Sequence, residues 1–141
     1  MHIYLTKIAA QGELDLIDRF FHPELIDEAA IAFGGPEGIK GLYGHVIGFR
    51  RNIGNATIGI QNIIGNEAQV MAQWSFTGTH DGPWLNQAPT NKPISGTVFS
   101  YFTLSEGLVI RYRLWLCARF EDLIVFDSSK PLPENLKPKQ K

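Results

Sequence analysis

The segment Leu108–Phe120 reads LVIRYRLWLCARF, and its side chains alternate with the period of two that is typical of a β-strand. One parity is apolar throughout: Ile110, Tyr112, Leu114, Leu116 and Ala118. The other parity mixes arginines with a tryptophan and a thiol: Val109, Arg111, Arg113, Trp115, Cys117 and Arg119. A half-exposed strand has one plainly polar face, so one interpretation is that the apolar face meets a partner subunit or another buried layer, while the mixed face borders a cavity. The alternative is that the arginines simply point to solvent.

Alternating segments continue from this strand toward the N-terminus. Residues 94–104 form a strand that is joined to it through Ser105-Glu106-Gly107, a hairpin signal. Residues 67–80 alternate in the same way, and Gly65-Asn66 provides a tight turn from an alternating segment that begins at Asn55. Long strands that follow one another without crossover helices predict an antiparallel sheet.

The first third of the chain shows helical spacing instead. A short helix is expected to end near Gly12, and a second one runs from Leu14 until Pro23 ends it, because the residue before a proline is pushed out of the helical region. After Gly34-Gly35-Pro36, apolar residues recur with the spacing of the clearest helix in the chain: Ile39, Leu42, Tyr43, Val46 and Ile47. The expected class is α+β, with N-terminal helices packed against the sheet.

Composition predicts one globular domain, since 44 % of the 141 residues are hydrophobic and 19 % are charged. We expect this domain to span residues 1–127, with a loose tail over residues 128–141. A formal net charge of −1 provides no long-range attraction to nucleic acid or to acidic membrane lipids. The single cysteine fits a reducing compartment, and no apolar run approaches the ~18 residues of a membrane helix or resembles a signal peptide, so the expected location is the cytoplasm.

Several motifs, in order along the chain, carry a resemblance to a known family. TGTHDG at residues 77–82 and PTNKPI at residues 89–94 resemble the family's GTH-x-G and PTG-K/R-x-V/I motifs. EGLVIRYRLWLC at residues 106–117 resembles the family's strand dGKIveyRvYiD, and GELD and GIKGL, at residues 12–15 and 38–42, resemble two helix segments. Over about residues 1–124 the chain is therefore similar to the SnoaL-like polyketide cyclases of the nuclear transport factor 2 superfamily.

The resemblance implies a cone of strongly curved antiparallel sheet, with helices inside its concave face and a pocket for a small apolar organic ligand. It also implies a homodimer formed through the convex face. Cyclases of the family close a ring by intramolecular aldol chemistry without a cofactor, and use an aspartate as acid and base with a histidine nearby. Other members of the superfamily isomerise, dehydrate or hydrolyse their substrates, or bind ligands without chemistry.

The sequence departs from the family pattern at the catalytic positions. The family's aspartate falls at Cys117, and a neutral thiol is a poor base for removing a proton from carbon. The family's histidine falls near Glu28, within Leu25-Ile26-Asp27-Glu28, and the glycine of the PTG motif is Asn91. The scaffold motifs are kept, whereas the catalytic pattern is altered.

The candidate catalytic residues are His80, Cys117 and Glu28. His80 ends a predicted strand beside a proline-rich loop, where it could exchange protons or simply tie the loop to the sheet. Free cysteines usually pack as small apolar groups, and Glu28, like its neighbour Asp27, could equally be a surface carboxylate near a helix end.

The candidate ligand-binding residues are aromatic groups and one cation: Arg113, Trp115, Trp74, Trp84 and Phe99. Core packing is the alternative for each aromatic residue. The four histidines show no metal-ligand spacing with one another or with the cysteine, so no metal site is predicted.

Two hypotheses about function follow. The first is a cofactor-independent cyclase, isomerase or hydrolase that acts on a small apolar carbonyl compound. The second is a ligand-binding or dimeric interaction module that has lost the acid–base aspartate. Both require the side chains of His80, Arg113, Trp115 and Cys117 to face one shared hollow.

Overall fold

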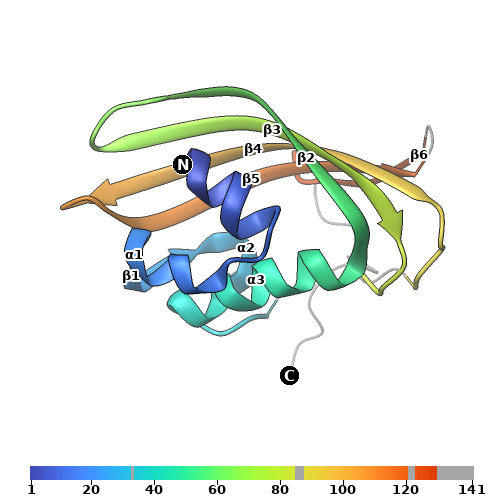
Figure 1. Cartoon of the computed structure of the whole chain (residues 1–141), viewed down its shortest axis with the longest axis horizontal. Coiled ribbons are helices and arrows are strands. Elements are labelled where there is room, and N and C mark those ends of the chain that lie inside the picture. The colour runs from blue at the N-terminus through green and yellow to red at the C-terminus, as the bar shows by residue number, and fades with distance from the viewer. Residues whose placement is uncertain (33, 85–87, 121–122, 130–141) are drawn as a thin grey trace.

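In the computed structural model, which describes residues 1–32, 34–84, 88–120 and 123–129, the chain begins with short helices and ends in long strands (Figure 1). The helical segments are a π-helix Tyr4–Ala9, a 3₁₀ turn Leu14–Leu16, α1 (Ile17–Phe20), α2 (Glu28–Ala32) and α3 (Ile39–Asn52). The strands are β1 (Phe21–Asp27), β2 (Ile53–Gly65), β3 (Gln69–His80), β4 (Pro93–Ser105), β5 (Leu108–Phe120) and β6 (Leu123–Asp127). The predicted tail lies outside the described residues from residue 130 onward.

The strands form one curved sheet in the order β1-β5-β4-β3-β2, with β6 also paired to β5. From β2 to β5 each strand pairs antiparallel with the next one along the chain. The helices lie together on one face of this sheet, with α3 running beneath it (Figure 1). The predicted α+β cone with N-terminal helices is confirmed.

The two predicted hairpins form because their turn residues tolerate the required backbone. Glu106 and Gly107 connect the paired residues Ser105 and Leu108 with φ angles of 51° and 81°, as a tight two-residue turn demands. In the other hairpin the side-chain oxygen of Asn66 accepts hydrogen bonds from the backbone of Ala68 and Gln69, at 2.9 and 3.0 Å.

Strand β1 was not predicted, and it changes the character of the sheet. It pairs with β5 in the parallel direction, so the expectation of a wholly antiparallel sheet is wrong at this edge. Its proline, Pro23, lies in an irregular stretch of the pairing between Phe21 and Ile26, where the missing N–H breaks no ladder. Strand β6 was also missed. Because β1 ends at Asp27, it places that carboxylate against the middle of the domain.

The concave face of the sheet carries the core. Tyr4 of the π-helix packs edge-on against Phe21, Phe102 and Tyr112, with ring centroids 5.4–5.8 Å apart. Phe102 and Tyr112 stack with their centroids 4.4 Å apart. Each such aromatic pair contributes about 0.5–1.5 kcal/mol beyond its burial, so this cluster fastens the first helix to β4 and β5.

The cavity borders the opposite face of β5 from the one that the sequence predicted. Its apolar parity, including Tyr112 and Leu116, is buried against the helices. On the mixed parity the side chain of Arg113 is 50 % exposed and Trp115 is 40 % exposed. The expectation that the mixed face borders a cavity is therefore wrong, because the helices cover the other face.

Candidate active site

A cavity of about 470 Å³ lies between the concave face of the sheet and α3. Its walls are largely apolar, and aromatic side chains form much of them: Phe49, Trp74, Phe76, Trp84 and Tyr112. This volume and this lining are typical of a pocket for a small organic ligand. Trp74 and Trp84 lie where the sequence placed them, in the wall of the cavity.

Helix α3 presents bare backbone to this cavity. Gly41, Gly44 and Gly48 recur at helical spacing and line it together with His45. A Cβ atom added at Gly44 or Gly48 would meet nothing within 4 Å. Since glycine destabilises a helix interior by about 1 kcal/mol relative to alanine, Gly44 and Gly48 keep space open at a cost in helix stability, whereas Gly41 packs closely against Pro36 and Ala30.

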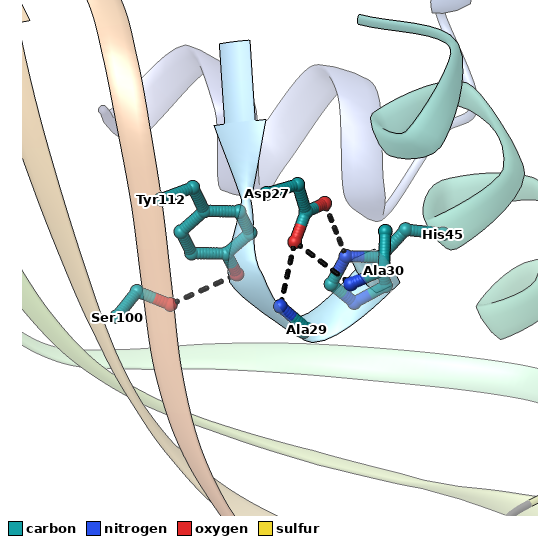
Figure 2. Close-up of polar contacts among 6 residues, drawn as sticks. All are labelled: Asp27, Ala29, Ala30, His45, Ser100 and Tyr112. Carbon is teal, nitrogen blue, oxygen red and sulfur yellow. Dashed lines mark hydrogen bonds and ion pairs between the residues drawn. The ribbon is translucent and has the colours of Figure 1, made fainter. Parts of the chain in front are cut away.

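His45 rises from this glycine-rich face and bonds to a buried carboxylate (Figure 2). Its Nδ1 atom lies 2.9 Å from Oδ2 of Asp27, the last residue of β1. The other oxygen of Asp27 accepts the backbone N–H groups of Ala29 and Ala30, each at 3.1 Å, as α2 begins. Three N–H donors suit a carboxylate, which is an acceptor only, so Asp27 is fixed in place.

The burial of the two partners differs. The side chain of Asp27 is 1 % exposed, whereas that of His45 is 27 % exposed and lines the cavity. Because the carboxylate can only accept, it holds the proton of the imidazole on Nδ1 and leaves the lone pair on Nε2. The Asp27–His45 pair therefore presents the basic Nε2 atom of His45 to the cavity, with the tautomer of the imidazole fixed by the bond to Asp27.

A second polar group lies beside this pair. The Tyr112 ring is nearly parallel to that of His45, with centroids 5.9 Å apart, and its hydroxyl lies 3.2 Å from Oγ of Ser100 (Figure 2). Trp74 donates its Nε1–H to the same Ser100 oxygen at 3.0 Å. Burial raises the pKa of Tyr112 and nearby Asp27 raises it further, although hydrogen bonds with Ser100 and with Tyr4 oppose both effects. The phenol is therefore neutral at physiological pH.

His80 lies elsewhere and joins the loop to the sheet. Its backbone bonds to residues 90–92, its Nδ1 lies 3.3 Å from Oγ1 of Thr90, and its ring stacks on Phe120 with centroids 5.0 Å apart. It is 1 % exposed and does not line the cavity, and its Nε2 has no hydrogen-bond partner among the residues that the structure describes. Burial lowers the pKa of His80, with Asp81 opposing, so the neutral form is favoured. This geometry fits the structural alternative given for His80.

Glu28 points away from the cavity. Its carboxylate pairs with Nε of Arg113 at 2.5 Å and with Nη2 of Arg111 at 3.4 Å, on the outer face of β5. Arg113 also lies over the Trp115 ring, 5.6 Å from its centroid. Because chain neighbours alternate in direction at the end of β1, Asp27 faces inward and Glu28 faces outward.

The remaining candidates also lie on the outer side. Phe99 is 44 % exposed, and Cys117 is half-buried between Thr97 and Asp127 in the ladder. The expectation that His80, Arg113, Trp115 and Cys117 share one hollow is thus wrong. Position 117 does not line the cavity. Cysteine in place of the family's aspartate at this position therefore removes no acid–base group from the cavity.

Sequence reasoning missed Asp27 as the inward carboxylate and missed His45, Tyr112 and Ser100. A signal was available for His45, which is the one imidazole among the apolar residues Leu42, Val46 and Phe49 of α3. Within residues 1–32, 34–84, 88–120 and 123–129, no group of three or more metal-ligating side chains gathers. In the same part of the chain, no helix is long and apolar enough to span a membrane.

A curved sheet closed over helices, with an apolar cavity between them, defines the class of nuclear transport factor 2-like α+β proteins. Within this class, the chain belongs to the SnoaL-like polyketide cyclase family, because the family model matches residues 3–116. No curated protein sequence matches the chain.

Solved structures support the same fold. TsrD from Streptomyces laurentii superposes with a TM-score of 0.71 and 16 % sequence identity, over 80 % of this chain and 82 % of that one. A candidate SnoaL-like polyketide cyclase from Jannaschia sp. gives 0.67 and 20 % identity, over 82 % and 81 %. A SnoaL-like polyketide cyclase from Agrobacterium tumefaciens gives 0.64 and 13 %, over 82 % and 85 %. At such identities the likeness concerns the fold alone.

Proposed function

We propose that this protein is a cofactor-independent enzyme that removes a proton from carbon next to the carbonyl group of a small apolar compound, and so closes a ring. The observation that supports this most strongly is the Asp27–His45 pair in the wall of an apolar cavity. Imidazole is the side chain most often used to exchange protons near neutral pH. A carboxylate that fixes its tautomer and can stabilise the charged ring is the usual companion of such a base.

In the proposed reaction, Nε2 of His45 takes a proton from the carbon next to the carbonyl group. The resulting carbanion attacks a second carbonyl carbon of the same molecule, which forms the new carbon–carbon bond. The proton then passes from His45 to the new alkoxide oxygen. Because no electrons enter or leave, this aldol chemistry requires no redox cofactor; return of the proton to another carbon would instead give an isomerase.

The cavity favours an apolar substrate. Its aromatic walls supply contact area to flat carbon skeletons, and an apolar ligand bound between them would displace water from the neighbourhood of His45. Exclusion of water strengthens the attraction between Asp27 and the imidazolium that forms during proton transfer.

Deuterium exchange of β-tetralone, a small aromatic ketone, tests the proton-transfer step without knowledge of the natural substrate. Proton NMR in D₂O follows the loss of the signals next to the carbonyl group. We expect the protein to accelerate exchange by at least about 100-fold over free imidazole at the same concentration, as a positioned base should. An exchange rate no greater than that of imidazole would rule out the proposed chemistry.

The second hypothesis, a ligand-binding module without chemistry, also has an observation in its favour. Asp27 caps the start of α2, and His45 packs its ring on Tyr112, so both residues also stabilise the fold. Tight binding of β-naphthol, which has the shape of the enol of β-tetralone, combined with no catalysed exchange would favour this reading.

We also propose a homodimer formed through the outer face of the sheet. Three large apolar side chains are exposed there on adjacent strands: Met71 at 42 %, Phe99 at 44 % and Trp115 at 40 %. An exposed cluster of this kind on a soluble domain usually marks an interface. A location in the cytoplasm stays a prediction, based on the single cysteine.

The substitution Phe99→Glu tests the dimer. We expect wild-type protein to sediment as a dimer and the variant as a monomer, because a buried unpaired charge costs several kcal/mol. Ile31→Glu, at an equally exposed side chain on α2, is the matched control and should remain dimeric. Analytical ultracentrifugation gives the mass, and a monomeric wild-type protein would contradict the proposal.

A further inference from the structure

The polar network beside the Asp27–His45 pair contains one group that can act on a ligand. Trp74, Ser100 and Tyr112 are linked in series, and the exposed fractions of Ser100 and Tyr112 are 0 % and 1 %. Trp74 and Tyr112 also line the cavity. The network is thus a polar patch on an otherwise apolar wall.

The order of donors in this network follows from its chemistry. An indole N–H can only donate, so the Ser100 oxygen accepts from Trp74. Ser100 still has its own proton, and the contact with Tyr112 permits either hydroxyl to donate. The Tyr112 hydroxyl also forms a hydrogen bond with Tyr4, whose hydroxyl can donate to it. When both Ser100 and Tyr4 donate to the Tyr112 oxygen, the phenolic proton is free to bind an oxygen atom in the cavity. A developing negative charge on that oxygen would favour this arrangement over its reverse.

The phenol is suited to donate rather than to ionise. Its burial, and the carboxylate of Asp27 nearby, raise the pKa of Tyr112 well above the usual range of tyrosine. Burial also raises the pKa of Tyr4, whose ring packs edge-on to Tyr112, and the nearby Tyr112 and Asp27 raise this pKa further. Both phenols therefore stay protonated, so they can donate hydrogen bonds and do not act as anionic bases.

We propose that the Tyr112 hydroxyl binds the carbonyl oxygen of the ligand and the oxyanion that forms on it, while Ser100 and Trp74 act as positioning residues. This inference rests on the proposed function, in which His45 takes the proton from the adjacent carbon. The stacked rings of His45 and Tyr112, 5.9 Å apart, bring the base and the hydrogen-bond donor to neighbouring parts of one ligand. Preorganised donors at a developing oxyanion are among the largest contributions to catalysis.

Binding of β-naphthol and of naphthalene to Tyr112→Phe tests this role by equilibrium dialysis. The two ligands share a ring system, and only β-naphthol carries an oxygen. We expect Tyr112→Phe to weaken β-naphthol binding about tenfold, the value of one hydrogen bond to a charged or polar oxygen, and to leave naphthalene binding unchanged. The unchanged naphthalene affinity would also show that the cavity is intact.

The absorption spectrum of bound β-naphthol provides a second readout that a merely structural role would not change. Tyr112 should stabilise the naphtholate, so in Tyr112→Phe the bound ligand should ionise at a higher pH than in wild type. Ser100→Ala should also raise the pH at which the bound ligand ionises, but by less, because the phenol remains and loses only its hydrogen bond with Ser100. Tyr101→Phe, on the outer face of β4, is the matched control and should match wild type.

An equal loss of both ligands, no loss of either, or a wild-type protein that does not prefer β-naphthol to naphthalene would overturn the inference. Its failure is distinguishable from failure of the proposed function. If wild type exchanges β-tetralone while Tyr112→Phe binds β-naphthol normally, the oxygen-binding role fails and the proton-transfer chemistry stands. If the loss is selective while wild type exchanges no deuterium, the oxygen-binding role stands and the catalytic proposal fails.

Discussion

Replacing His45 by glutamine is expected to lower the rate of β-tetralone deuterium exchange by about 100-fold or more, since a positioned base contributes about 10²- to 10⁴-fold. Glutamine is close in size and can still donate an amide hydrogen to Asp27, so the neighbouring structure should be kept. It has no nitrogen that can take a proton. Initial rates measured by NMR in D₂O, at equal protein concentration, give the ratio of the two proteins directly.

The control for this prediction is His2→Gln, because His2 is exposed near the N-terminus and far along the chain from α3. Its exchange rate should equal that of wild type. Naphthalene affinity should be the same in both variants, which separates loss of the base from loss of the cavity. If His45→Gln keeps the wild-type rate, the base lies elsewhere and the Asp27–His45 pair has only its structural role.

The long antiparallel strands could be predicted because their information is local. Alternation with a period of two, together with turn residues such as Glu106-Gly107 and Asn66, fixes each hairpin without reference to distant parts of the chain. Strand β1 depends instead on parallel pairing with β5, more than eighty positions further on by the register Phe21 to Val109. The spacing of apolar residues in 21–27 gives no information about pairing with β5, and Pro23 argues against a strand.

The faces of β5 show a second limit. Alternation separates the side chains into two sets, but it does not say which set the helices cover. The aromatic and charged set of Arg113 and Trp115 suggested a ligand pocket, whereas these side chains lie on the outer face, with Glu28 paired to the arginine. The uniformly apolar set, which predicted contact with a partner subunit or another buried layer, packs against the helices, and its members Tyr112, Leu114 and Leu116 line the cavity.

The candidate site could not be predicted because it joins elements that no local pattern connects. Asp27 reaches His45 only because β1 ends beside Tyr112 and α3 runs beneath the sheet. His80 belongs to a motif shared with the family, yet its surroundings are the loop at residues 90–92 and the Phe120 ring. A motif therefore indicated the scaffold correctly without indicating which of its polar side chains faces the cavity.

The substitution Gly48→Leu is expected to weaken β-naphthol binding by about 10- to 150-fold, since a leucine side chain placed in the cavity removes contacts worth about 1.5–3 kcal/mol. Gly48 has ordinary helical backbone, and a Cβ atom there would meet no neighbour within 4 Å. The new side chain should therefore enter the cavity without disturbing the fold. Equilibrium dialysis measures the affinity, and urea unfolding measures the stability.

Gly48→Ala separates the effect of filling the cavity from the effect on the helix. Alanine should raise the free energy of unfolding by about 1 kcal/mol, because glycine is the poorer helix former, and its single methyl group should leave most of the binding intact. Leucine has nearly the same helix propensity, so it should stabilise the protein at least as much while it excludes the ligand. Opposite changes in stability and affinity would show that α3 keeps its glycines for the sake of the space beside His45. If Gly48→Leu binds β-naphthol as tightly as wild type, the ligand occupies a different part of the molecule, and His45 is not positioned to act on it.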